Sequence, residues 1–199
     1  MSVVANSINK VNSTNKQRGV GLVEVLIAVL VFALGILGMA SMQVNAKRVS
    51  YDALQRSLAT ALTRDIIERM RSNPADTSLL VYGAVDDLGG GSITTEPTPN
   101  CKSATCTPAQ LAAHDIWEWE QALDGASETS GGTNAGGLVS PQACITYAAG
   151  VVTVTVAWKG YDGKANPIPG NTCGTTSGLY GAGNVDRQLI VINTYIEEV

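Results

Sequence analysis

The segment Arg18-Gly19-Val20-Gly21-Leu22-Val23-Glu24 separates a polar leader from a long apolar run, and the interpretation of the whole chain begins there. The leader, residues 1–19, carries only three charges, all of them basic. The apolar run from Val25 to Ala40 contains no charged residue. Glu24 lies at the edge of this run, where an ionisable group is costly in lipid and therefore indicates a function. The pattern predicts a membrane helix with one functional carboxylate near its start.

The helical pattern continues beyond the apolar run. Residues 41–72 contain neither Pro nor Gly, and apolar residues recur there at steps of three and four. Asn73-Pro74 should end the helix, because proline disfavours a helical conformation in the residue before it. We therefore predict one helix over residues 20–72. The apolar residues expected to pack its second half against a globular domain are Val49, Ala53, Leu54, Leu58, Ala61, Leu62, Ile66 and Met70.

The predicted organisation has three parts: a basic leader of residues 1–19, the long helix, and a globular domain of residues 73–199. Within the helix, residues 20–43 are expected to lie in a membrane or a filament core, and residues 44–72 to be amphipathic. The formal net charge is −4, and loss of the leader with its three basic residues leaves −7. A nucleic-acid-binding domain would need a basic stripe, which the sequence lacks, so no nucleic-acid partner is predicted.

All four cysteines follow the apolar run: Cys101, Cys106, Cys144 and Cys173. Basic residues on one side of a membrane segment mark that side as cytoplasmic, which places the cysteines in the periplasm, where disulfides persist. Four cysteines allow three pairings. We favour Cys101–Cys106 with Cys144–Cys173, because the first pair closes a short loop. No C-x-x-C spacing occurs, so zinc is the weaker interpretation and no metal or cofactor is predicted.

A second helix has a well-defined start. Thr107 is the expected N-cap, Pro108 suits the first helical position, and Gln110 completes a capping box. Its expected apolar face is Ala112, Ile116, Trp119 and Leu123, and Gly125 should end it. The acids Asp115, Glu118 and Glu120 surround His114, the one histidine of the chain. We interpret His114 as a solvated residue on this helix and predict no catalytic residue.

The remaining segments indicate an α+β fold, in which the long helix packs on an antiparallel sheet. Residues 73–106 contain many turn signals, with one short strand expected at residues 79–82. Residues 125–142 are rich in Gly, Ser and Thr and predict a mobile loop. Strands are predicted at residues 144–147 and 151–158, joined as a hairpin. A last strand at residues 187–196 is almost continuously apolar, which predicts a central position buried on both faces.

The leader and the apolar run together resemble the class III signal of type IV prepilins. In that signal the chain is cut after a glycine, here Gly19, and a glutamate occupies the fifth mature position, here Glu24. Major pilins usually begin with Phe, whereas this mature chain would begin with Val20. Residues 34–43 and 106–119 are similar to the minor pilins of the PilV family, the type IV pilus modification proteins.

This resemblance implies a minor pilin inserted once in the inner membrane, with its C-terminal domain in the periplasm. The prepilin peptidase would cut after Gly19 and methylate the amine of Val20, and Glu24 would direct assembly and register. The implied partners are other minor pilins, the major pilin, an adhesin-like tip protein and the inner-membrane assembly platform. Such a protein primes pilus assembly, lies at the pilus tip, and supports twitching motility and adhesion.

Three other interpretations remain open from the residues. A minor pseudopilin of a type II secretion system shares the same signal and long helix. An ordinary secretory signal would use Gly38-Met39-Ala40 as its cleavage site, although Glu24 has no purpose there. A secreted or membrane-anchored enzyme would need a nucleophile–base pair or paired acids, and no recognisable motif of that kind occurs.

Overall fold

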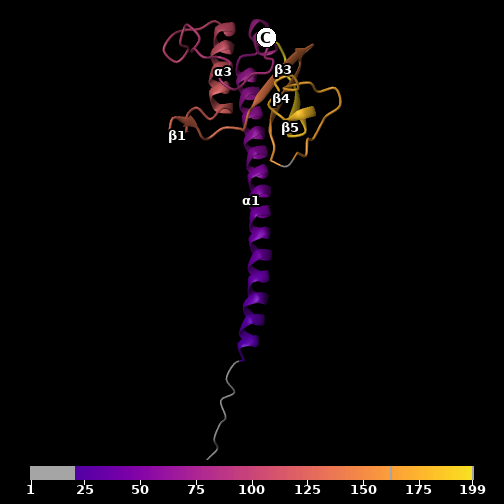
Figure 1. The fold of residues 1–199 in the computed structure, drawn as a ribbon. Helices are drawn as coiled ribbons and strands as arrows, with labels where there is room; N and C mark the ends of the chain where they lie inside the picture. The colour runs from indigo at the N-terminus through magenta and orange to yellow at the C-terminus, as the bar shows by residue number, and fades with distance from the viewer. Residues whose placement is uncertain (1–20, 162, 199) are drawn as a thin grey trace, which may run out of the picture. The chain divides into compact units, whose positions relative to one another are not determined.

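The computed structural model describes residues 21–161 and 163–198. It divides the chain into two compact units, residues 1–45 and residues 46–199. Helix α1, Leu22–Ser72, begins in the first unit and continues into the second (Figure 1). The start of the predicted helix at Val20 lies outside the described residues. Its predicted end is confirmed, since α1 stops at Ser72, directly before Asn73-Pro74.

In the second unit, one stripe of α1 enters the core. Its buried residues follow steps of three and four and comprise Gln55, Ala59, Leu62, Thr63, Ile66, Ile67 and Met70. The predicted stripe agrees with this from Leu62 onward. It is wrong for four exposed residues: Val49, Ala53, Leu54 and Ala61. The side chains of Val49 and Leu54 are each 62% exposed. The periodicity of α1 therefore includes apolar residues that this chain does not itself cover.

Two segments predicted as strand or loop have a different structure. Residues 79–82, predicted as a strand, belong to the short helix α2, Asp76–Tyr82. The local pattern was misleading because Leu79 and Tyr82 are one helical turn apart, and both are fully buried. The glycine-rich segment predicted as a loop contains a small antiparallel ribbon of β1, Thr129–Ser130, and β2, Thr133–Asn134.

Helix α3, Pro108–Leu123, begins as predicted. The Thr107 side chain accepts from the Gln110 backbone N–H, and the Gln110 side chain accepts from the Thr107 N–H, which completes the capping box. The predicted apolar face is confirmed, because Ala112, Ile116, Trp119 and Leu123 are all buried. The Trp119 indole N–H donates to the carbonyl oxygen of Leu62 at 2.9 Å, which ties α3 to α1. In Figure 1, α3 and the three-stranded sheet lie on either side of the end of α1.

The main sheet is antiparallel and has the order β3-β4-β5: β3 is Gln142–Ala148, β4 is Val151–Lys159 and β5 is Arg187–Tyr195. The predicted hairpin of β3 and β4 is confirmed, with Ile145 opposite Val154. The predicted central position of the last strand is wrong, because β4 is central and β5 lies at an edge. The second face of β5 is apolar for another reason: Leu189 packs there with Ala157 and Tyr180 in a second small core.

Two disulfides cross-link the second unit: Cys101–Cys106, with a sequence separation of 5, and Cys144–Cys173, with a separation of 29. Cys173 is buried, and its bond fixes the long loop before β5 to strand β3. The pairing in the structure is the one favoured from the sequence. A cross-link stabilises a fold mainly by restricting the unfolded chain, and it does so more for a longer loop.

The glycine-rich segment of residues 89–93 is held by two carboxylates at the C-terminal end of α3, one in its last turn and one at its C-cap. Glu120 is fully buried and accepts from the Ser92 N–H, the Ser92 hydroxyl and the Ile93 N–H, at 2.5–2.7 Å. Asp124, one turn later, accepts from the N–H groups of Gly90 and Gly91. Gly89 allows this path, because its φ is +141° and a Cβ there would lie 2.3 Å from the carbonyl oxygen of Pro141.

Removing each disulfide by a pair of Cys→Ala substitutions should lower the free energy of unfolding unequally. We expect a loss of about 3–4 kcal/mol for Cys144–Cys173 and about 2 kcal/mol for Cys101–Cys106, from the lengths of the closed loops. Denaturant unfolding followed by Trp fluorescence measures this, since all three Trp residues lie in the second unit. Equal losses would show that loop length does not determine their contribution.

Glu120→Gln should destabilise the second unit by about 1–3 kcal/mol, because an amide nitrogen would then face a buried N–H donor. Asp124→Asn is the matched control: its side chain is only half-buried, so water can replace the lost acceptor and the loss should be smaller. The same unfolding measurement compares the two variants. A larger loss for Asp124→Asn would contradict the assignment of Glu120 as the principal anchor of residues 89–93.

Candidate functional site

The first described residues of the chain place Glu24 in the first turn of α1. The Glu24 backbone N–H donates to the carbonyl oxygen of Gly21 at 2.9 Å, which closes that turn. A carboxylate at this position is favourable to the helix dipole. Its side chain is exposed within the unit. Gly19 and Val20, the predicted cleavage and methylation residues, lie outside the described residues.

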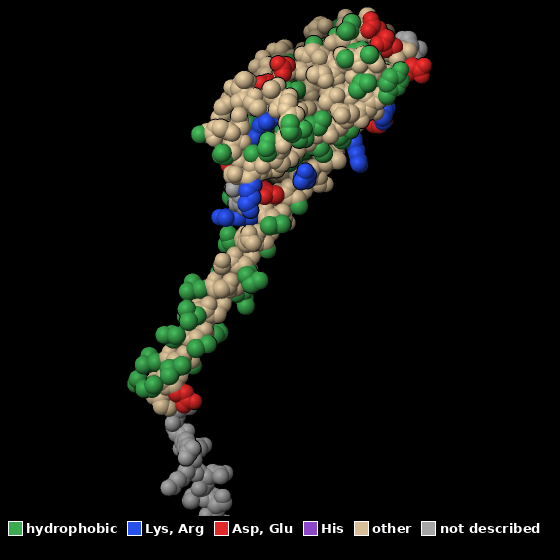
Figure 2. Space-filling model, turned by 90° about the vertical axis from the view of Figure 1, so that its right-hand side faces the viewer, with side chains coloured by type: hydrophobic (Ala, Val, Ile, Leu, Met, Phe, Trp, Pro, Cys, Tyr) green, Lys and Arg blue, Asp and Glu red, His purple; other side chains and the backbone are tan. Residues whose placement is uncertain are grey.

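The helix that follows Glu24 exposes an unusual amount of apolar surface. Every large apolar side chain from Leu22 to Val44 is between 50% and 77% exposed. Figure 2 shows these side chains on the visible face of the helix next to the grey residues. A contiguous apolar surface of this size marks contact with a partner or a membrane. By length and composition, α1 is able to span a membrane.

Gly35 and Gly38 lie within this apolar segment, one turn apart. A Cβ added at either position would have no neighbour within 4 Å. Both glycines are therefore open to the approach of another helix, as small residues are in packed membrane helices. The segment thus has the features of a helix that packs among other helices: apolar on all sides, locally narrow, and headed by one carboxylate.

A cluster of charged residues joins α1 to α3 in the second unit. The Arg69 guanidinium contacts Asp115 at 2.9 Å, Glu118 at 2.7 Å and Asp65 at 3.0 Å. Lys102 contacts Glu118 at 2.6 Å. The Tyr82 hydroxyl donates to Asp115 at 2.5 Å, which brings α2 into the same cluster.

The electrostatics of this cluster favour its ionised form. Partial burial by itself raises the pKa of Glu118, but Lys102 and Arg69 outweigh it, so the pKa is held below its usual value. Burial also opposes the charge of Arg69, yet hydrogen bonds to Glu118 and Asp115 raise its pKa. Burial and then the neighbouring Asp115 raise the pKa of Tyr82, which stays a neutral donor. The arrangement fixes helices to one another and leaves Asp115 and Glu118 engaged as acceptors.

The interpretation of His114 as solvated is wrong. Its side chain is buried, and its Nε2 lies 3.2 Å from Glu96 and its Nδ1 lies 3.9 Å from Glu118. Asp115 and Glu120 are buried as well. The spacing of Asp65 and Arg69, four residues apart on one helix, was visible in the sequence. Their contacts with α3 were not, since those depend on how α1 and α3 pack.

One group of potential metal ligands occurs among the described residues, and it does not form a metal site. Asp87 lies within 4.8 Å of the sulfurs of Cys144 and Cys173. Those sulfurs are bonded to each other and are not thiolates, the form that binds metal. The Asp87 carboxylate instead accepts from the Gly174 N–H and the Thr176 hydroxyl, and so positions the loop that follows Cys173.

Comparison with known proteins gives two matches. Residues 14–40 match the prokaryotic N-terminal methylation motif. Residues 41–117 match the family described as type IV pilin Tt1218. No curated protein and no solved structure matches the chain.

The two matched ranges are adjacent in the sequence, and each contains different structural features. The first holds Gly19, Glu24 and most of the exposed apolar helix. The second holds the buried stripe of α1, helix α2 and the first half of α3. The fold is the pilin-like α+β arrangement of a long N-terminal helix, a further helix and an antiparallel sheet. Together the two matches support a type IV pilin with a prepilin methylation motif.

Proposed function

We propose that this type IV pilin is a minor pilin of the PilV kind, which assembles with other minor pilins to prime the pilus and lies at its tip. The supporting observation is the exposed apolar helix headed by Glu24, joined to a disulfide-linked domain. Pilins of this type are made in a membrane-anchored form, processed by the prepilin peptidase, and assembled with other pilins. The similarity of residues 34–43 and 106–119 to PilV minor pilins supports the finer assignment.

The proposed location follows from the same features. Before assembly the chain crosses the inner membrane once, with the disulfide-bearing domain in the periplasm. After assembly it lies in the pilus, beneath an adhesin-like tip protein and above the major pilin. The assembly platform in the inner membrane would move it between these states. In this role the protein supports twitching motility and adhesion.

A deletion strain tests the function against its alternative, a minor pseudopilin of a type II secretion system. For a minor pilin, pili should be lost or strongly reduced while type II secretion stays intact. Restoring the wild-type chain should restore piliation. Normal piliation with impaired secretion would establish the pseudopilin role instead.

Processing should leave a mature chain that begins at Val20 with a methylated amine. The leader contributes three basic residues and no apolar segment, so the peptidase would recognise it from the cytoplasmic side. Mass spectrometry of the N-terminal peptide from membranes measures the cut and the methyl group. Gly19→Ala should block cleavage, and Gly21→Ala is the neighbouring control. A mature chain beginning at Ser41 would show that Gly38-Met39-Ala40 is the cleavage site of an ordinary signal.

Glu24→Gln should leave processing and membrane insertion unchanged but strongly reduce incorporation into the minor pilin complex and into pili. Cleavage creates a positive amine at Val20, and an unpaired charge among packed helices costs several kcal/mol. Glu24 of one subunit would neutralise that amine on its neighbour and set the axial register. Immunoblots of sheared pili and crosslinked membranes quantify incorporation.

Glu68→Gln is the matched control, because Glu68 is an exposed carboxylate on the same helix within the second unit. It should assemble at the wild-type level. Normal incorporation of Glu24→Gln would contradict the assembly role of Glu24 and favour a carboxylate that only reaches headgroup water.

A further inference from the structure

A small aromatic and basic surface lies at the end of the second unit that contains Ala46. Tyr51 of α1 and Tyr161, after β4, are stacked edge to face with ring centroids 6.0 Å apart. The guanidinium of Arg48 lies 5.8 Å from the centre of the Tyr161 ring. Tyr161 is nevertheless 63% exposed. We call this surface, with the lysines described next, the basal surface.

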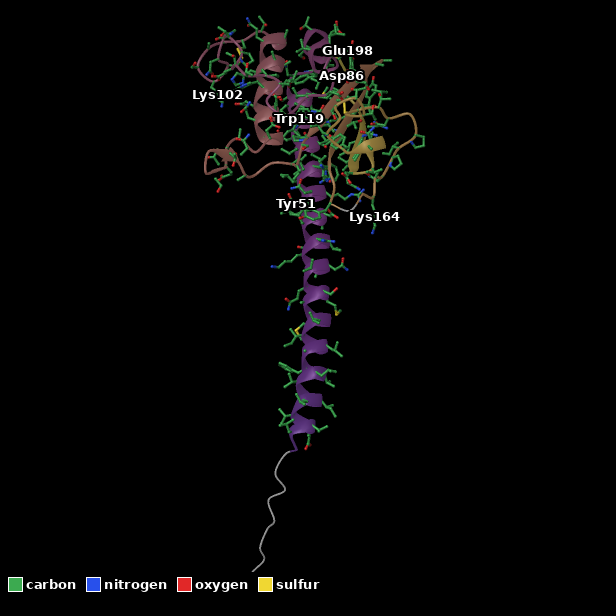
Figure 3. All side chains as sticks on the ribbon, in the orientation of Figure 1. Tyr51, Asp86, Lys102, Trp119, Lys164 and Glu198 are labelled. Carbon is green, nitrogen blue, oxygen red and sulfur yellow. A yellow bond between two sulfur atoms is a disulfide. The ribbon has the colours of Figure 1, made fainter. Side chains whose placement is uncertain are left out.

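Three lysines extend the basal surface, and all three are exposed: Lys47, Lys159 and Lys164. Lys159 lines a cavity of about 290 Å³ with Tyr51, Tyr161 and Val139. Figure 3 shows Lys164 and Tyr51 at the same end of the second unit. Three acids are nearby: Asp52 on α1, Asp186 in the cavity wall, and Asp162, which follows Tyr161 in the sequence. Figure 2 shows Lys and Arg side chains gathered around α1 at this end of the unit.

This concentration of positive charge contrasts with the chain as a whole, whose net charge is −4. Arg48 and the three lysines carry four positive charges against these three acids, so the basal surface is net positive in a chain that is net negative. The basal surface therefore fits an anionic partner, and its two tyrosines fit a boundary between apolar and aqueous surroundings.

The uncharged segment that precedes Lys47 determines which boundary between apolar and aqueous surroundings this is. Residues 25–46 carry no charge, and 22 residues at 1.5 Å per residue span roughly 33 Å, close to the thickness of a bilayer hydrocarbon core. If Glu24 lies at one face of the membrane, Lys47 and Arg48 reach the headgroups of the other. The basal surface then begins where the hydrocarbon ends, at the depth where phospholipid phosphates lie.

We propose that the basal surface binds the headgroups of anionic phospholipids in the periplasmic leaflet and holds the domain of the unassembled pilin on the membrane. This inference rests on the membrane insertion of the proposed function. The loop of Tyr161 and Lys164, as well as α1, contacts the headgroups, because the stack of Arg48, Tyr161 and Tyr51 joins that loop to α1. On assembly these contacts are exchanged for contacts with neighbouring subunits.

Lysine acetylation of the full chain in vesicles tests the proposal. The chain is reconstituted in phosphatidylcholine alone or mixed with phosphatidylglycerol, acetylated briefly, and the modification of each lysine is read by mass spectrometry. Lys159 and Lys164 should react about fivefold more slowly in the anionic vesicles, which corresponds to about 1 kcal/mol for each basic residue near such a surface. Lys102, exposed but paired with Glu118, is the internal control and should react equally in both.

Two variants, each with a matched control, sharpen the test. Arg48→Gln removes a charge and the contact with Tyr161, and it should reduce the protection of Lys159 and Lys164. Arg64→Gln is the matched control, because it removes an exposed arginine from the same helix outside the basal surface and should leave protection unchanged. Tyr161→Ala should act like Arg48→Gln, whereas Tyr195→Ala removes an equally exposed tyrosine of β5 and should not.

Equal reactivity of Lys159 and Lys164 in the two kinds of vesicle would overturn the proposal. So would equal protection in both, which would indicate cover by another copy of the chain instead of by anionic lipid. Flotation of the vesicles separates these results from failure of the proposed function. A chain that does not float with the vesicles is not membrane-inserted, and both inferences then fall together.

Discussion

The apolar surface of α1 before residue 45 is the constraint on which the rest of the molecule depends. Side chains there that are at least half exposed would each contribute about 1.5–3 kcal/mol on full burial. Among the described residues of the first unit, α1 is the only helix or strand, so no other described element buries these side chains. A membrane before assembly and packed pilin helices after assembly are two surroundings that can bury these side chains. The fold of the second unit must therefore form independently of how this surface is covered.

That independence is visible in how the second unit holds its own part of α1. The Trp119 indole donates to the Leu62 carbonyl, and Arg69 contacts carboxylates of α3. Gln55 accepts from the Val139 N–H at 3.1 Å, which ties α1 to the segment before β3. Because these contacts are polar and directional, they fix one rotation of α1 in the core. Burial of apolar side chains alone would allow several rotations of α1 about its axis.

The features predicted correctly from the sequence are those determined locally. The start of α3 follows from the chemistry of Thr107, Pro108 and Gln110, and the end of α1 from Asn73-Pro74. The β3–β4 hairpin follows from alternation of residue types across a short turn. Each of these signals involves residues within a few positions of one another, so no tertiary information was needed.

The features predicted wrongly depend on contacts distant in sequence. A nearly continuous apolar run cannot tell a central strand from an edge strand that is covered on its second face, as β5 is by Tyr180 from the loop before it. His114 looked solvated because its partner Glu96 belongs to the loop of residues 83–107 and not to its own helix. In the candidate site, the position of Glu24 was evident from sequence. The basal surface was not, since Tyr51 and Tyr161 are 110 positions apart.

The charges at the two ends of the apolar segment have different consequences. Residues 25–46 separate Glu24 from Lys47 without an intervening charge, so α1 has a preferred depth in a bilayer. In a filament the same helix has other helices as its surroundings, and a carboxylate in that low-dielectric core requires a positive partner. The basic residues beyond the segment remain near water in both states. Under the proposed function, Glu24 is therefore the charge whose electrostatic surroundings would change most on assembly, and the free energy that favours one register over another would be concentrated at that end of the helix.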